Sequence, residues 1–178
     1  MRRNDASGPG AFRRSSPIVW RSGFELLLAA ALSAGCASAT SGVSSGQSVP
    51  FNDHGTTQQS GNDGGPRIAV ANDAGLIGLG QLAQASQGGR LYVGVFAGTQ
   101  RTGGYSVSVD RIERTGDSIV VHATFSGPAP GALTIQVITS PAQLVSIDQQ
   151  SASGVRSAVL VDQSGTERAR ASVTQSRS

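Results

Sequence analysis

The feature that most constrains the fold is an alternation of apolar and polar residues, with a period of two, between residues 91 and 173. Strands alternate in this way because successive side chains point to opposite faces of a sheet. Turn-forming residues such as Thr115-Gly116-Asp117 and Gln163-Ser164-Gly165 separate the runs. The expected strands lie near residues 91–96, 105–109, 119–125, 133–137, 144–147, 155–161 and 169–173. The sequence therefore predicts a mainly β fold, a small antiparallel β-sandwich or barrel.

One short helix is expected at the N-terminal end of this folded segment. Asn72 or Asp73 can cap it, and one side of the helix would carry the apolar residues Leu76, Leu79, Leu82 and Ala83. Glycines within this stretch weaken the helix by about 1 kcal/mol each relative to alanine. The folded domain is therefore expected over residues 67–178, beginning with this helix and the short apolar run before it.

The same stretch contains a weak nucleotide-binding pattern. Gly78, Gly80 and Ala83 match the G-x-G-x-x-A fingerprint of dinucleotide-binding folds. That chemistry also needs a parallel βαβ unit and an acidic residue about twenty positions further on. No acid occurs between Asp73 and Asp110, and antiparallel strands are expected there. A glycine-containing amphipathic helix is the preferred interpretation, and no cofactor is expected.

The first 35 residues have the composition of an export signal. All five arginines of this segment precede an apolar run, Leu26–Leu32, and small residues follow it up to Cys36. A transmembrane helix needs about 18 or more uninterrupted apolar residues. Arg21 and Glu25 interrupt the run, which favours a cleaved signal peptide over residues 1–35.

The string Leu32-Ser33-Ala34-Gly35-Cys36 resembles the lipobox of bacterial lipoproteins. The resemblance implies that Cys36, the one cysteine of the chain, is lipidated and becomes the mature N-terminus. An ordinary secretory signal with an incidental cysteine is the alternative. Because Ala37 is neutral, resemblance to Gram-negative sorting favours the outer membrane. We therefore expect a lipid-anchored protein of the bacterial cell envelope that faces the periplasm.

Residues 36–66 are rich in Ser, Gly, Thr, Gln and Asn, with isolated apolar residues such as Val49 and Phe51. Such a segment buries too little apolar area to offset the entropy lost on ordering. It is predicted to be a flexible, disordered linker. His54 lies within it, and a lone linker histidine lacks the convergent partners of a metal site.

The distribution of charge argues against nucleic acid as a partner. The formal net charge is +3, and residues 1–35 alone account for it with five arginines and two acids. The rest of the chain holds nine arginines and nine acids, so it has no basic footprint for phosphate.

The sequence contains no constellation that predicts an enzyme or a metal site. One cysteine and two histidines cannot build a Cys- or His-based zinc centre. His122 lies in an expected strand without an identifiable nucleophile, and Asp110 and Glu113 flank arginines in a solvated segment. The interpretation is a non-enzymatic protein without catalytic residues.

Three motifs in order and at matching spacing resemble the PrcB family of protease-complex subunits. The first comprises Phe96-Ala97-Gly98 and Arg101-Thr102-Gly103-Gly104-Tyr105-Ser106-Val107. The second is Pro128-Ala129-Pro130-Gly131, and the third joins Thr139-Ser140-Pro141 to Leu144-Val145-Ser146-Ile147. The third departs from the family pattern at Ala142, where an aromatic residue is favoured. The match runs from about Leu91 to Asp148.

The resemblance implies a small lipoprotein that docks on a secreted subtilisin-like protease, or another envelope protein, and stabilises it. Loops on a rigid β scaffold concentrate binding residues, so Arg101, Thr102, Gly103, Gly104 and Tyr105 are the predicted partner-binding residues. An alternative is a protease inhibitor, because Thr102–Tyr105 is similar to a loop of chagasin-type inhibitors.

Overall fold

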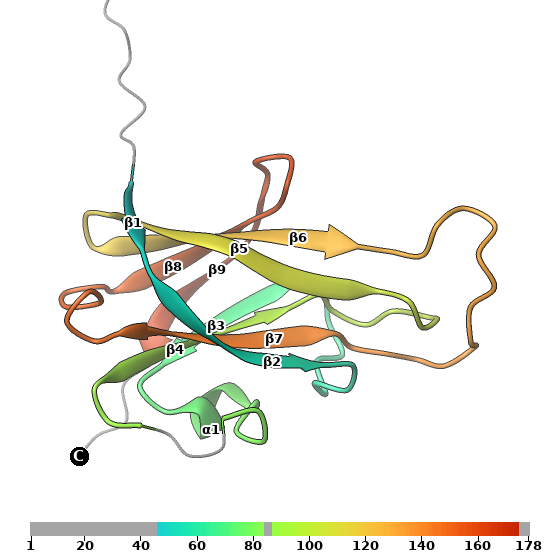
Figure 1. Ribbon diagram of the computed structural model, residues 1–178, viewed down its shortest axis with the longest axis horizontal. Coiled ribbons are helices and arrows are strands. Elements are labelled where there is room, and N and C mark those ends of the chain that lie inside the picture. The colour runs from blue at the N-terminus through green and yellow to red at the C-terminus, as the bar shows by residue number, and fades with distance from the viewer. Residues whose placement is uncertain (1–45, 84–86, 175–178) are drawn as a thin grey trace, which may run out of the picture. The chain divides into compact units, whose positions relative to one another are not determined.

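The computed structural model describes residues 46–83 and 87–174 of the chain (Figure 1). The predicted signal peptide and Cys36 lie outside the described residues. The described part is mainly β, which confirms the predicted fold class. Its strands are β1 (Gln47–Val49), β2 (Phe51–Thr57), β3 (Arg67–Ala71), β4 (Arg90–Phe96), β5 (Ser106–Thr115), β6 (Ser118–Ser126), β7 (Ala142–Asp148), β8 (Ser157–Val161) and β9 (Glu167–Thr174), and its helix is α1 (Ala74–Ile77).

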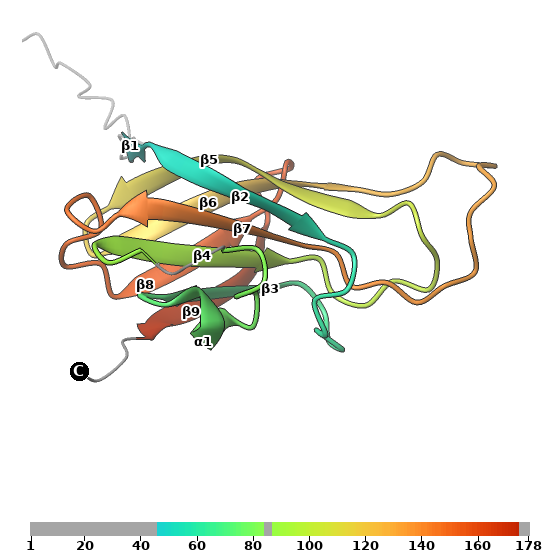
Figure 2. The same ribbon diagram turned by 60° about the horizontal axis from the view of Figure 1, so that its bottom comes forward.

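The strands form one sheet that closes almost completely into a barrel, with the order β1-β5-β6-β8-β9-β3-β4-β7-β2. The two outermost strands, β1 and β2, are separated in the chain by Pro50 alone. Val49 pairs with Ile112 on β5, and Phe51 pairs with Ile147 on β7. One bent segment therefore bridges the two edges of the sheet, as Figures 1 and 2 show. Two pairings, β6 with β8 and β3 with β9, are parallel and the others are antiparallel.

The remaining gap in the barrel lies between β5 and β7, which share no backbone ladder within the described residues. Gln143 on β7 bridges it, because its side-chain oxygen accepts a 2.6 Å hydrogen bond from the backbone N–H of Val109. Gln143 is 4% exposed, and the register of β5 shifts just after Val109. A buried amide therefore supplies the contact that a regular ladder would supply elsewhere.

Two apolar clusters stabilise the barrel. The interior is filled by alternating residues of the strands, among them Val93, Val95, Ile119, Val121, Val145 and Leu160. A second cluster lies outside β4 and β7, where Tyr92, Phe96 and Leu144 pack against Ile77 and Leu79 of the helical segment. Strands β4 and β7 are thus buried on both faces, which explains their nearly continuous apolar sequence.

The helix is shorter than the sequence predicts. Asp73 caps it as expected, accepting a 2.6 Å hydrogen bond from the N–H of Gly75. Gly78 adopts a left-handed conformation, with φ of 86°, and ends the helix after one turn. Leu79 still reaches the core, but Leu76 is 55% exposed. Among the described residues, no helix has the length and hydropathy required to cross a bilayer.

The prediction that residues 36–66 form a flexible linker is wrong for its second half. Residues 47–49 and 51–57 are strands β1 and β2, and in the loop that follows the N–H of Ser60 donates to the carbonyl of Ser140, in the loop before β7. The domain therefore begins near residue 46, about twenty residues earlier than predicted. The polar sequence misleads because strand pairing uses backbone groups, and β2 contributes few side chains to the core. Residues 36–45 lie outside the described residues.

The prediction of a strand at residues 133–137 is also wrong. These residues have no regular structure and belong to the long loop between β6 and β7. Their alternating apolar side chains point into solvent, with Leu133 103% exposed and Ile135 71% exposed. Apolar alternation determines which face of a strand each side chain occupies, but a strand also needs a neighbouring backbone with which to form hydrogen bonds. No strand of the described barrel lies beside residues 133–137 to provide one.

Candidate functional site

Three loops project from one end of the barrel, on the right-hand side of Figure 1. They connect β2 to β3 (residues 58–66), β4 to β5 (97–105) and β6 to β7 (127–141). The predicted partner-binding residues, Arg101–Tyr105, all lie in the middle one. Backbone hydrogen bonds tie the three loops together.

The loop from 97 to 105 is held against the loop from 127 to 141. Gln100 and Thr139 exchange two backbone hydrogen bonds, of 2.8 and 3.0 Å. The hydroxyl of Thr139 donates to the carbonyl of Thr102 at 3.1 Å, and the N–H of Gly103 donates to the carbonyl of Ile135 at 3.1 Å. The predicted binding loop is therefore fixed in one conformation by its neighbour.

The other side of the loop is fixed through glycine. Gly98 has φ of 81°, and a Cβ on it would lie 2.5 Å from the carbonyl oxygen of Gly64. This close approach lets the N–H of Thr99 donate to the same carbonyl at 2.9 Å. The hydroxyl of Thr99 also donates to the carbonyl of Asn62 at 3.0 Å. Only glycine combines that backbone angle with that approach.

The five predicted binding residues differ in their accessibility. Arg101 is exposed and makes no hydrogen bond or ion pair within the described residues. Thr102 is half-buried, Gly103 is buried beneath Ile135, and Gly104 is exposed with φ of 90°. The ring of Tyr105 is half-buried against Gly127. Arg101 is therefore the one side chain of the five that is charged, free and directed to solvent.

A small cavity of about 180 Å³ lies beside the same loop. Tyr105, Phe125 and Arg168 contribute to its wall, and the guanidinium of Arg168 lies 5.5 Å from the centre of the Phe125 ring. The side-chain amide of Gln163 makes two 3.1 Å hydrogen bonds with the backbone of Phe125. This wall therefore combines the aromatic surface of Tyr105 and Phe125 with the cationic side chain of Arg168.

A comparison with protein families identifies this part of the chain. The PrcB C-terminal family matches residues 91–148. The chain carries a PrcB C-terminal domain. No curated protein and no solved structure matches the chain.

The matched residues contain two of the three loops at this end of the barrel, those at 97–105 and 127–141. They run from Leu91 to Asp148 and so contribute β4, β5, β6 and β7 of the barrel. The other strands lie outside the match, yet β1 and β2 close the barrel onto β5 and β7. The PrcB C-terminal domain of this chain therefore supplies four of the nine strands of the described barrel, and segments on either side supply the other five.

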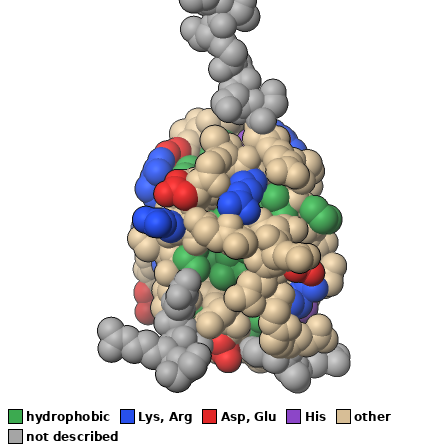
Figure 3. All heavy atoms as spheres, turned by 90° about the vertical axis from the view of Figure 1, so that its left-hand side faces the viewer, with side chains coloured by type: hydrophobic (Ala, Val, Ile, Leu, Met, Phe, Trp, Pro, Cys, Tyr) green, Lys and Arg blue, Asp and Glu red, His purple; other side chains and the backbone are tan. Residues whose placement is uncertain are grey.

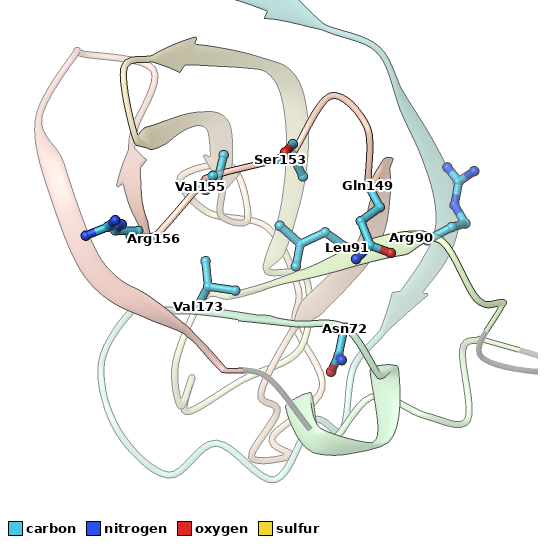
Figure 4. Close-up of a pocket in the computed structure, with 10 residues that line it drawn as sticks. Asn72, Arg90, Leu91, Gln149, Ser153, Val155, Arg156 and Val173 are labelled. Atoms are coloured by element: carbon cyan, nitrogen blue, oxygen red, sulfur yellow. The ribbon is translucent and has the colours of Figure 1, made fainter. Parts of the chain in front are cut away.

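The opposite end of the barrel, which lies away from the three loops, contains a larger cavity. A cavity of about 450 Å³ opens there, with Leu91, Val155 and Val173 in its wall (Figure 4). Figure 4 shows the side chains of Arg90 and Arg156 on opposite sides, pointing away from its middle. The surface at this end carries scattered arginine and acidic side chains (Figure 3). Neither the cavity nor this surface was predicted from the sequence.

Sequence reasoning also missed a polar cluster on β2, β4 and β7. The hydroxyl of Ser146 lies 2.8 Å from Nε2 of His54 and accepts a 2.7 Å hydrogen bond from Arg90. Serine next to histidine is the pattern of a nucleophile and its base. Here Ser146 is 0% exposed, so a substrate cannot reach the hydroxyl. The cluster attaches β2 to its neighbours, which explains why His54 does not belong to a linker.

The acidic and histidine residues that were considered as catalytic groups are paired on the barrel surface. Glu113 forms an ion pair with Arg111 at 2.9 Å, and the resulting hydrogen bond lowers the pKa of the Glu113 carboxyl. His122 Nε2 lies 3.4 Å from the same carboxylate. Asp110 instead accepts a hydrogen bond from Thr124. Within the described residues, no group of three or more His, Cys, Asp or Glu side chains could hold a metal ion.

Proposed function

We propose that this chain is a lipid-anchored binding module of the bacterial cell envelope, which docks on an envelope protein and stabilises it. The observation that carries the proposal is the Arg101–Tyr105 loop within a PrcB C-terminal domain, which backbone hydrogen bonds hold in place and from which Arg101 is exposed. The family resemblance makes a secreted subtilisin-like protease the partner class of first choice. Binding through a fixed loop costs little conformational entropy, since its backbone is already ordered.

The chemistry of the loop supports recognition of an acidic or carbonyl-bearing surface. Arg101 has five donor groups and makes no hydrogen bond or ion pair within the described residues. Charge-assisted hydrogen bonds to a carboxylate are among the stronger polar contacts at an interface. Arginine and tyrosine are also the residue types that most often dominate binding energy. Arg101 and the accessible edge of Tyr105 are therefore the proposed anchors.

The proposed lipid anchor would keep the proposed partner close to the membrane. Ten residues, 37–46, separate Cys36 from β1, and a fully extended chain of that length spans at most about 35 Å. A lipid on Cys36 thus keeps the barrel near the periplasmic face of the outer membrane. The proposed partner is secreted through, or attached to, that same surface.

Inhibition of a protease is less well supported than docking. An inhibitory loop enters the active-site cleft of the enzyme, so its tip must be free. Here Gly103 is buried beneath Ile135, and Tyr105 packs on Gly127. The adjacent loop from 127 to 141 would have to move aside before Thr102–Tyr105 could enter a cleft.

The experiment combines recovery of the partner with a functional assay. The tagged chain and its Arg101→Ala/Thr102→Ala variant are each purified from cross-linked envelope fractions, and recovered proteins are quantified by mass spectrometry. The partner is the protein that the variant recovers less well. If it is a protease, adding the chain should lengthen its active lifetime, whereas stoichiometric loss of activity would favour inhibition.

A further inference from the structure

The cavity of about 180 Å³ beside the Arg101–Tyr105 loop has a wall that combines aromatic rings with one charged group. The rings belong to Tyr105 and Phe125, which are both half-buried. Among the described residues that form the wall, Arg168 is the one that carries a charge, and none contributes a carboxylate. The cavity therefore offers apolar surface next to a single cation.

Arg168 lies near the start of β9 and is held in this wall by its neighbours. Its guanidinium carbon is 5.5 Å from the centre of the Phe125 ring, within the range of a cation–π contact. Two 3.1 Å hydrogen bonds between the side-chain amide of Gln163 and the backbone of Phe125 attach the turn between β8 and β9 to β6. Nη1 of Arg168 lies 3.4 Å from Oδ2 of Asp162, in the same turn. Residues of β6 and of the turn thus hold the charge beside the rings.

Asp162 leaves most of the hydrogen-bonding capacity of Arg168 unused. Its Oδ1 accepts three hydrogen bonds, from the N–H and the hydroxyl of Ser164 and from the N–H of Thr166. Its Oδ2 approaches Arg168, but 3.4 Å is long for a charge-assisted hydrogen bond. The N–H groups on Nε and Nη2 of Arg168 make no hydrogen bond within the described residues. The Arg168 side chain is 41% exposed, against 11% for Asp162, so a ligand can reach the guanidinium.

The polar groups of the wall favour a hydrogen-bond acceptor with negative charge. The hydroxyl of Tyr105 makes no hydrogen bond within the described part of the chain. Arg168 would repel a cationic ligand, and an apolar ligand would leave the donors of Arg168 and Tyr105 unpaired. A carboxylate accepts hydrogen bonds from both groups, and its pairing with a guanidinium is among the stronger polar contacts in proteins. The methylene groups that carry the carboxylate can pack against the two rings.

We infer that this cavity binds the carboxylate of an aspartate or glutamate side chain in the protein that docks on the Arg101–Tyr105 loop. The inference rests on the proposed function and adds a second contact to the same interface. Tyr105 belongs both to the loop and to the wall of the cavity, so one extended segment of the partner can contact both. Arg168 lies outside residues 91–148, which match the PrcB C-terminal family. The preference for an acidic residue is therefore supplied by β9.

Selection of peptides tests this preference without an identified partner. Peptides that bind the purified chain are recovered from a phage-displayed random library, and their aspartate and glutamate content is compared with that of the unselected library. The wild type should enrich acidic residues, and Arg168→Gln should lose most of the enrichment. Arg111→Gln is the matched control and should keep it, because Arg111 is also exposed and paired with one carboxylate, that of Glu113, but lies outside the wall. Absence of acidic enrichment by the wild type, or equal enrichment by Arg168→Gln, overturns the inference.

A thermodynamic cycle then locates the carboxylate. A selected peptide is synthesised with an acetylated N-terminus and an amidated C-terminus, so that its side chains carry its only carboxylates. Replacing its acidic residue by the corresponding amide, or Arg168 by Gln, should each weaken binding about tenfold in isothermal titration calorimetry. The two changes together should weaken it little more than either alone, since both remove the same contact. Additive losses would place the carboxylate elsewhere and contradict the inference. Thermal unfolding of Arg168→Gln verifies that it is folded.

Recovery of the envelope partner separates this inference from the proposed function. In cross-linked envelope fractions, Arg168→Gln should reduce recovery of the same protein that Arg101→Ala/Thr102→Ala recovers less well. A loss with Arg101→Ala/Thr102→Ala but not with Arg168→Gln would leave docking through the loop in place and overturn the carboxylate site. A failure to recover any partner would count against the proposed function, and the peptide cycle would still decide whether the cavity binds a carboxylate.

Discussion

The backbone N–H of Gly103 donates a 3.1 Å hydrogen bond to the carbonyl oxygen of Ile135. This contact joins the loop in which sequence motifs predict binding to the loop that was predicted to be a strand. It depends on glycine, because a Cβ on Gly103 would lie 2.8 Å from Cγ1 of Ile135. The two loops consequently form one surface, although Gly103 and Ile135 are 32 positions apart in the chain.

Replacing Gly103 with alanine should loosen this surface. The added methyl group forces Ile135 outwards, and overpacking of this kind costs about 1 kcal/mol at a partly yielding site. The thermal midpoint of Gly103→Ala should therefore fall by several degrees. The matched control is Gly103→Ala/Ile135→Ala, in which the clashing carbon is absent and most of the loss should be recovered. A double variant no more stable than Gly103→Ala would show that the Ile135 contact is not the cause.

Gln143 provides a second prediction, because it bridges the gap between β5 and β7. Gln143→Ala leaves the buried N–H of Val109 without its acceptor, which costs about 1–3 kcal/mol. Chemical denaturation measures the change in the free energy of unfolding. Gln136→Ala removes the same side chain from an exposed position and should change stability by less than about 0.5 kcal/mol. Equal effects of the two substitutions would exclude the proposed role of Gln143.

The polar N-terminal segment supplies a third prediction. A chain that begins at residue 58 lacks β1 and β2, which exposes the ladder edges of β5 and β7 and removes the contact of His54 with Ser146. It should unfold at a much lower temperature than a chain that begins at residue 46, or fail to fold. Circular dichroism during heating provides the comparison. Identical unfolding curves would restore the interpretation of residues 46–57 as a linker.

Strand β2 is an example of a strand that apolar periodicity does not predict. The strands that fill the interior, such as β4 and β6, alternate because their side chains create the core, and the sequence predicts them. Strand β2, with the sequence Phe-Asn-Asp-His-Gly-Thr-Thr, pairs with β7 alone and leaves several of its side chains in solvent. Its stability comes from backbone hydrogen bonds and from His54, neither of which produces a hydrophobic pattern.

Residues 133–137 show the opposite error, in which apolar periodicity predicts a strand that does not form. Their apolar alternation is as regular as that of β6, yet they are not a strand, because no neighbouring backbone is present to pair with them. For the candidate site, sequence motifs predicted which residues lie in the loop at 101–105. They could not predict that Gly103 is buried, since burial depends on Ile135, which is distant in the chain.

The predicted anchor leads to a fractionation experiment. Cys36→Ser should move the protein from the membrane fraction to the soluble fraction, because acyl chains contribute about 0.8 kcal/mol for each buried CH₂ group. Cys36 precedes the described strands in the chain, so thermal unfolding of the soluble serine variant should match that of the unmodified domain. Retention of the serine variant in the membrane would exclude the lipid anchor as its cause.

Docking through the Arg101–Tyr105 loop is the central claim, and site-specific photo-cross-linking in intact cells tests it most directly. A photoreactive residue at Thr99, exposed beside Arg101, is compared with one at Ser153, exposed at the opposite end of the barrel. The account predicts a covalent adduct with one envelope protein from position 99, little from position 153, and a several-fold loss when Arg101→Ala is added. An adduct that forms equally from both positions, or that persists undiminished in Arg101→Ala, would contradict it.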